Sequence, residues 1–245
     1  MPPPPPYSPY SLEGQCVLVT GVRRLFPSCF HVHSSSARSP ALGPAAAGAS
    51  AGIGEACAWR FAEAGCRLVL LARRADRLDA LKAELEAAHG SAVHTVVLDV
   101  RDAAGVAALP AALPEAFRGV DILLNNAGLA LGVEAADEVD LDDARTMLES
   151  NVLSVVGFTR AFTPGMRARN RGHVINISSV AAQEAYAGGS VYCATKHALA
   201  ALTVAARHDF VGTDIRVTAI SPGAVETEFS GERRRRGLAP KPRPH

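Results

Sequence analysis

Six short runs of apolar residues, separated by stretches with helical periodicity, constrain the fold of this sequence more than any other feature. The runs cover residues 16–20, 67–71, 93–98, 120–124, 173–177 and 215–220. Continuous rather than alternating apolar residues are typical of strands that are buried on both faces. The sequence therefore predicts an α/β fold, a doubly wound, Rossmann-like parallel sheet covered by helices on both sides.

The stretches between the runs have the period expected of helices. Leu78, Leu81 and Leu85 recur at helical spacing, and a helix that begins near Ile53 presents a buried stripe up to about Ala64. A Pro-interrupted helical region spans 102–118, and a long helix spans 141–169, with Pro164 as the point where it can bend. Residues 191–206 read as an Ala-rich helix.

Composition narrows the classes of protein to consider. With 245 residues and 48% hydrophobic content, the chain can bury one large core, which we place at 12–230. A net charge of +1 gives no electrostatic reason to expect a nucleic-acid or membrane partner. The Pro-rich residues 1–11 have the composition of a disordered extension and lack the features of a secretory signal. Residues 231–245 are predicted to be a basic, disordered tail.

The five cysteines are scattered without a C-x-x-C pair, which is typical of reduced thiols and favours a cytoplasmic location. Cys29, His31 and His33 lie close together but lack a fourth ligand, so we expect no metal site. The basic run at 233–236 is better explained as a solvated charge cluster than as a nucleic-acid site.

The strongest chemical signal is a tyrosine followed four residues later by a lysine. Tyr192 and Lys196 share one face of the predicted 191–206 helix, so an ammonium can lie near the phenol and favour its ionised form. Ser179 lies thirteen residues before Tyr192, just after a predicted strand, and its hydroxyl could bind the same substrate oxygen. A Tyr–Lys pair alone more often forms a solvated helix face.

Other suggestive residues also follow predicted strands. In doubly wound sheets, ligands bind beyond the carboxyl ends of the strands, where the strand order reverses. The glycine-rich segment at 48–54 precedes a helix whose N-terminus could bind a phosphate. Separately, each of these segments could be a simple turn or cap. The groups that follow strands are Arg73 and Arg74, Asp99 and Val100, Asn125 to Gly128, Ser178 and Ser179, and Pro222 and Gly223.

Taken together, these motifs resemble the short-chain dehydrogenase/reductase family over roughly 15–230. The matching motifs are T-G…A-G-I-G, N-N-A-G, Asn151, Ser179, Y-x-x-x-K and P-G. Y-A-G-G-S-V-Y-C-A-T-K and S-P-G-A-V-E-T-E-F are similar to NADP-dependent 3-hydroxy acid dehydrogenases that also oxidise serine. The resemblance implies hydride transfer between NADP(H) and a small hydroxy acid or related alcohol.

The resemblance also implies roles for individual residues. Tyr192 would be the general acid/base, Lys196 would lower its pKa and hold the nicotinamide ribose, Ser179 would orient the substrate, and Asn151 would position a water. It further implies a homo-oligomer formed through the helices that carry Asn151 and Tyr192. The implied cofactor-binding residues are Thr20, Gly21, Ser50, Gly52, Ile53, Gly54, Arg73, Arg74, Asp99, Val100, Asn125, Ala127, Gly128, Tyr192, Lys196, Pro222, Gly223 and Thr227.

The residues after the second predicted strand indicate which dinucleotide is preferred. An NAD-dependent enzyme usually places an acidic residue there to bind the ribose hydroxyls. This chain has Ala72, Arg73 and Arg74 instead, and guanidinium groups suit a 2′-phosphate. The sequence therefore predicts NADP(H).

Two departures from the family pattern leave alternatives open. The glycine motif is divided after Gly21 by an irregular segment, 22–48, which we interpret as an insertion. The family's seventh strand has no counterpart after the P-G motif, so the sixth strand is expected to be a sheet edge. Besides an active oxidoreductase, the chain could be a nucleotide-binding pseudoenzyme or a defective, intron-retaining and truncated gene product.

Overall fold

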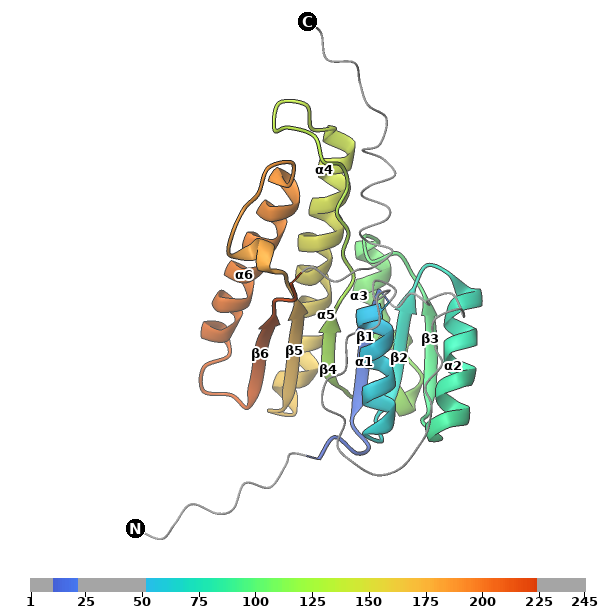
Figure 1. Cartoon of the computed structure of the whole chain (residues 1–245). Coiled ribbons are helices and arrows are strands. Elements are labelled where there is room, and N and C mark those ends of the chain that lie inside the picture. The colour runs from blue at the N-terminus through green and yellow to red at the C-terminus, as the bar shows by residue number, and fades with distance from the viewer. Residues whose placement is uncertain (1–10, 22–51, 224–245) are drawn as a thin grey trace, which may run out of the picture.

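The computed structural model describes residues 11–21 and 52–223, and within these ranges one six-stranded sheet organises the chain (Figure 1). All neighbouring strands pair in parallel, in the order β3-β2-β1-β4-β5-β6. The order reverses beside β1, and the predicted doubly wound fold is confirmed. The strands are β1 (Cys16–Thr20), β2 (Arg67–Ala72), β3 (Val93–Val97), β4 (Val120–Asn125), β5 (Gly172–Ile177) and β6 (Ile215–Ile220).

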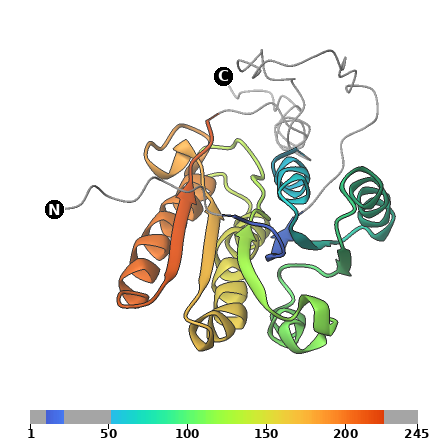
Figure 2. The same cartoon turned by 90° about the horizontal axis from the view of Figure 1, so that it is seen from below.

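Helices cover both faces of this sheet. Figure 2 shows α1 and α2 on one side and α3, α5 and α6 on the other. Two short 3-10 turns, Glu115–Phe117 and Val180–Ala182, lie in the connections. The helices are α1 (Gly52–Glu63), α2 (Ala75–His89), α3 (Ala103–Ala112), α4 (Leu141–Leu148), α5 (Ser154–Ala168) and α6 (Ser190–Asp209).

The two faces of the sheet explain why the strands are apolar throughout. Val17 and Val19 of β1 pack into the cluster beneath α1 and α2. Leu18 points the other way and packs with Phe158 and Phe162 of α5. Because successive side chains of a strand point to opposite faces, a strand between two helical layers is apolar at most of its positions.

The predicted long helix at 141–169 is interrupted, but at a different place from the one expected. A π-helical turn, Glu149–Leu153, separates α4 from α5, whereas Pro164 lies inside α5. The π-helical turn carries Asn151, and the side chain of Asn151 forms hydrogen bonds with the backbone of Leu129. This contact accompanies the break in the helix. π-Helical turns frequently occur at functional sites.

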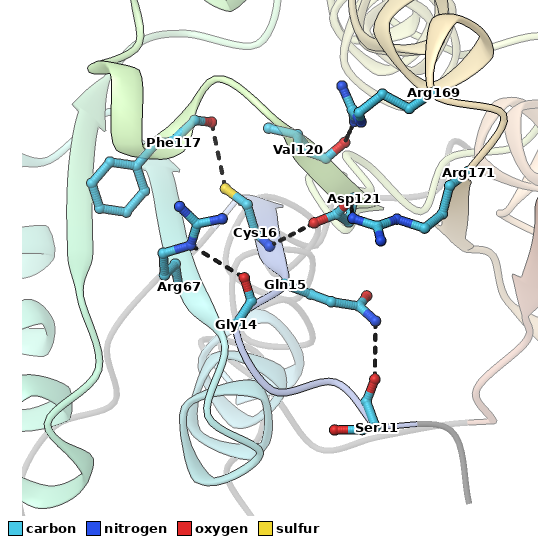
Figure 3. A network of polar contacts seen from close by, with 10 residues as sticks. All are labelled: Ser11, Gly14, Gln15, Cys16, Arg67, Phe117, Val120, Asp121, Arg169 and Arg171. Atoms are coloured by element: carbon cyan, nitrogen blue, oxygen red, sulfur yellow. Dashed lines mark hydrogen bonds and ion pairs between the residues drawn. The ribbon is translucent and has the colours of Figure 1, made fainter.

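A buried carboxylate ties the strands together at their amino ends (Figure 3). The pairing of β1 with β4 skips one residue between Cys16 and Val17, and Asp121 is the β4 residue at this irregularity. Its carboxylate accepts the Cys16 N–H at 3.1 Å and Arg171 Nη2 at 2.8 Å. The buried charge is thereby paired, as a buried carboxylate requires.

Several predicted features fall outside the described residues. They are most of the Pro-rich extension, the 22–48 segment, the Cys29 cluster and the basic tail. Among the described strands, β3 and β6 form the two edges of the sheet, and the absence of a seventh strand stays a prediction. In the same ranges, no helix is long and apolar enough to cross a membrane, and no group of His, Cys, Asp or Glu could hold a metal ion.

Candidate active site

The predicted functional residues gather at the carboxyl ends of the strands, beside the reversal of strand order (Figure 1). Thr20 ends β1, Arg73 follows β2, Asn125 ends β4 and Ser178 follows β5. Of the predicted site residues, Ser50 and Thr227 lie outside the described residues.

The first part of the site is the turn after β1, which is locked onto the segment after β4. The Thr20 hydroxyl accepts the backbone N–H groups of Asn126 and Ala127, at 3.0 and 3.1 Å. In return, Asn126 Nδ2 donates to the carbonyl oxygens of Thr20 and Gly21, at 3.0 and 3.3 Å. Gly21 has a φ of 70°, and a Cβ there would lie 2.5 Å from the Ala127 Cα, so only glycine fits.

The amino end of α1 returns to this turn even though thirty residues separate it from Gly21. A Cβ on Gly54 would lie 2.5 Å from Asn126 Nδ2 and 3.4 Å from the Gly21 carbonyl oxygen. Gly52 is the first described residue of α1, so the amino end of the helix and the positive end of its dipole lie at this edge. Such a strand–turn–helix arrangement is suited to a pyrophosphate.

The second part of the site is the pair formed by Tyr192 and Lys196 on α6. Both side chains are buried, and Lys196 Nζ lies 5.8 Å from the centre of the Tyr192 ring. The ammonium donates to the Ile177 carbonyl oxygen at 2.9 Å, at the end of β5. Burial lowers the pKa of Lys196 to about 8. The buried pair is therefore not the solvated helix face that the spacing alone permits.

Asn151 holds the π-helical turn against this pair. Its Oδ1 accepts the Leu129 N–H at 2.8 Å, and its Nδ2 donates to the Leu129 carbonyl at 2.7 Å and to Thr195 Oγ1 at 3.1 Å. Thr195, which sequence analysis missed, is fully buried between Tyr192 and Lys196 and donates to the Tyr192 carbonyl at 2.7 Å. Only its position inside the Y-x-x-x-K motif could have indicated it.

Gly128 joins these two parts of the site. A Cβ added there would lie 3.2 Å from Asn151 Oδ1 and 3.7 Å from Lys196 Nζ. Because the backbone approaches the lysine this closely, the N-N-A-G segment borders both the glycine turn and the Tyr–Lys pair. The side chain of Asn125 points into the interior, where its Nδ2 donates to Asn176 Oδ1 at 2.9 Å. The role of Asn125 toward the cofactor stays a prediction.

The serines after β5 differ in their surroundings. Ser179 caps the short turn after β5 and accepts the Ala181 N–H on its hydroxyl oxygen at 3.1 Å, which leaves its hydroxyl hydrogen available as a donor. Ser178 is buried, and its hydroxyl has no hydrogen-bond partner among the described residues. Val180 donates its N–H to the Pro222 carbonyl at 3.1 Å, which places the P-G motif beside Ser179.

A cluster of charges lies at the ends of β2 and β3. Asp99 accepts from Arg101 at 2.8 Å and lies 3.9 Å from Arg73 Nη1. The hydrogen bond from Arg101 is the main reason that the pKa of Asp99 lies below its usual value. Arg74 is the residue immediately before α2, and Val100 packs against the core. Sequence analysis named Arg73 and Asp99 but not Arg101.

Two cavities within the described residues are candidates for the active site. A small cavity of about 20 Å³ reaches Tyr192 and is lined by the segments at 131–147 and 188–191. A larger one of about 400 Å³ lies at the opposite end of the sheet and is lined by Arg169, Arg171 and Asp121 among others. Its charged groups already bind one another or the backbone, so we place the site at Tyr192.

Comparisons with known proteins agree with this geometry. A 48% identical relative, over 76% of this chain and 74% of its own length, is the NADP-dependent 3-hydroxy acid dehydrogenase of Salmonella typhi. The serine 3-dehydrogenase of Rhizobium radiobacter is 45% identical over 75% of this chain and 72% of its own length. The crystal structure of serine dehydrogenase from Escherichia coli superposes with a TM-score of 0.69, at 38% identity over 84% of this chain and 82% of that one. The sequence profile described as short chain dehydrogenase matches residues 45–237, and the chain belongs to that family.

Proposed function

We propose that the protein is an NADP(H)-dependent oxidoreductase that interconverts a small hydroxy acid, or a related alcohol, and the corresponding carbonyl compound. The observation that carries the proposal is the buried Tyr192–Lys196 pair on α6, held beside Asn151 and the Gly128 backbone. A phenol near an ammonium can both give and take a proton near neutral pH, as the interconversion of an alcohol and a carbonyl requires.

Each residue of the pair has a distinct task in this reaction. Tyr192 transfers the proton to or from the substrate oxygen. Lys196, whose pKa burial lowers to about 8, is still protonated at pH 7 and favours the ionised phenol. Ser179 donates its hydroxyl hydrogen to the same substrate oxygen, because its own oxygen already accepts the Ala181 N–H. Asn151 fixes the backbone that faces Lys196.

The residues at the β1–α1 turn fit a dinucleotide. Gly21, Gly54 and Gly128 keep the backbone bare where a Cβ would collide with its neighbours, at 2.5, 2.5 and 3.2 Å. Thr20 fixes the turn, α1 offers its N-terminus to the pyrophosphate, and Arg73 with Arg74 suits the 2′-phosphate of NADP(H). When bound, the nicotinamide supplies the hydride chemistry at the carbinol carbon.

The substrate class rests on the relatives. One is named for 3-hydroxy acids and another for serine, which is itself a 3-hydroxy acid. We extend that class to this chain because it is 48% and 45% identical to these relatives and carries the buried Tyr192–Lys196 pair. The four cysteines in the described ranges are free thiols, which supports a reducing, cytoplasmic location.

Replacing Tyr192 tests the proposal. Tyr192→Phe keeps the ring but removes the proton carrier, so kcat for serine or a 3-hydroxy acid should fall by roughly a hundredfold or more. The affinity for NADPH, measured by nicotinamide fluorescence, should stay nearly unchanged. Tyr186→Phe removes a phenolic hydroxyl six residues earlier and serves as the matched control. Wild-type turnover in Tyr192→Phe would show that the catalytic residue is misassigned.

A further inference from the structure

One carboxylate at the carboxyl ends of β2 and β3 lies between two arginines. Arg101 binds Asp99 through Nε, at 3.1 and 3.3 Å from the two carboxylate oxygens, and through Nη2 at 2.8 Å. Arg73 Nη1 lies 3.9 Å from the same Asp99 and makes no closer ion pair within the described residues. Asp99 therefore forms a close ion pair with Arg101 and a longer one with Arg73.

The placement of the three residues follows from the sheet. β2 and β3 are neighbours, with Ala72 paired to Val97, so Arg73 and Asp99 emerge side by side. The Arg101 backbone N–H also donates to Asp99 at 3.0 Å, which fixes the carboxylate toward Arg101. The side chain of Arg73 is 59% exposed, so its guanidinium remains accessible to a ligand.

We propose that Arg101 is a specificity-determining residue that selects NADP(H) over NAD(H) by occupying Asp99 and leaving Arg73 for the 2′-phosphate. The inference rests on the proposed function, because it assumes that the dinucleotide binds at this edge. Arg73, Asp99 and Arg101 together carry one net positive charge, and without Arg101 that charge falls to zero. Asp99 would then attract Arg73 and repel a 2′-phosphate, whose charge is about −1.5 to −2.

The effect is selective because it acts only through the 2′-phosphate. NAD(H) has a hydroxyl at that position and needs no free guanidinium, so the loss of Arg101 leaves its binding nearly unchanged. Arg101 acts through Asp99 and Arg73, so it is a positioning residue and not itself a ligand of the phosphate. Removing the carboxylate as well should therefore make Arg101 dispensable.

The test compares three full-length variants by fluorescence titration with NADPH and with NADH. In Arg101→Gln, we expect NADPH affinity to fall about fivefold, the size of a surface ion pair, and NADH affinity to change less than about twofold. Adding Asp99→Asn to Arg101→Gln should restore the ratio of the two affinities to the wild-type value. Arg145→Gln breaks another arginine–aspartate pair, with Asp142 on α4 at 2.7 Å, and should leave both affinities unchanged.

Other outcomes would overturn the proposal in recognisable ways. An equal loss of NADPH and NADH affinity in Arg101→Gln would mean that Arg101 only supports the local structure. A double variant whose ratio of NADPH to NADH affinity stays as low as in Arg101→Gln would mean that Arg101 binds the phosphate directly. If the wild-type protein binds NADH as tightly as NADPH, the proposed cofactor preference itself fails, whatever the variants do.

Discussion

Lys196 places a buried positive charge beside Tyr192 in the candidate site. Its ammonium is buried near the Tyr192 ring and, within the described residues, donates one hydrogen bond, to the Ile177 carbonyl oxygen. Burial lowers its pKa from 10.5 to about 8, which means that the charged lysine reduces the stability of the folded protein at neutral pH. A residue that costs stability and is nevertheless placed beside a tyrosine is typical of a functional site.

This cost predicts how stability depends on pH. Below pH 8 the lysine is protonated in both the folded and the unfolded chain, but between pH 8 and 10.5 only the unfolded chain holds the proton. Unfolding then takes up a proton, so stability rises with pH across this window. Relative to Lys196→Met, the free energy of unfolding should rise by about 3 kcal/mol over the window and stay flat below it.

Urea titrations of both proteins at several pH values measure this difference. Lys82→Met, which replaces a partly exposed lysine on α2, is the matched control for a lost lysine. A difference between wild type and Lys196→Met that is constant from pH 7 to 10.5 would contradict the buried, charged lysine.

Sequence alone indicated the proposed catalytic residues but not the side chains that hold them. The spacing of Tyr192 and Lys196 places them on one helix face wherever the helix lies. The pairing of Thr195 with Asn151, or of Arg101 with Asp99, depends on side-chain directions that no spacing encodes. The contact of the Asn125 amide with Asn176 is a further example of a side-chain direction that the sequence does not give, and the role of Asn125 toward the cofactor stays a prediction.

At the scale of elements, β1 and α1 form the unit on which cofactor binding depends. Gly21 and Gly54 lie side by side, both against Asn126, although the 22–48 segment intervenes in sequence. The described ends of the interval are therefore close enough to be joined by a short turn. Removing 22–48 would leave T-G-A-S-A-G-I-G between strand and helix.

We expect that removal to tighten NADPH binding. A long connection adds only about 0.6 kcal/mol of closure entropy per doubling of its length, so the fold tolerates it. A phosphate-binding turn is less tolerant, since the glycine backbone must meet the pyrophosphate closely. A chain lacking 22–48 should bind NADPH at least tenfold more tightly, or by about 1.4 kcal/mol. Fluorescence titration of both chains measures this, and equal affinity would refute the idea that the segment weakens the site.

Elements were predictable to different degrees for a physical reason. Strands in a two-sided sheet are apolar at most positions, so all six were recognised from their short apolar runs. The π-helical turn at Glu149–Leu153 was not recognised, because the hydrogen bond that accompanies it, from Leu129 N–H to Asn151 Oδ1, joins residues far apart in the sequence. Pro164, the obvious sequence signal for a bend, lies within α5.

At the scale of the whole molecule, exposed apolar residues gather on the helices that carry the site. Leu148 on α4 and Val156 on α5 are 45% and 42% exposed, and Leu153 between them is 61% exposed. Val204 on α6 is 50% exposed. Large apolar side chains left in water on adjoining elements favour association with a second copy.

We therefore propose that the protein forms a homo-oligomer through α4, α5 and α6, with the helices of the catalytic residues at the interface. A stable interface needs roughly 1,200–2,000 Å² of buried surface, which adjoining helices of this length can supply. Leu153→Glu places a charge at the centre of that surface and should shift the protein toward monomer in sedimentation equilibrium. Val97→Glu alters a residue that is 57% exposed at the end of β3, at the opposite edge of the sheet from β6, and should leave the assembly intact. A wild-type protein that sediments as a monomer, or equal dissociation by both variants, would rule out this interface.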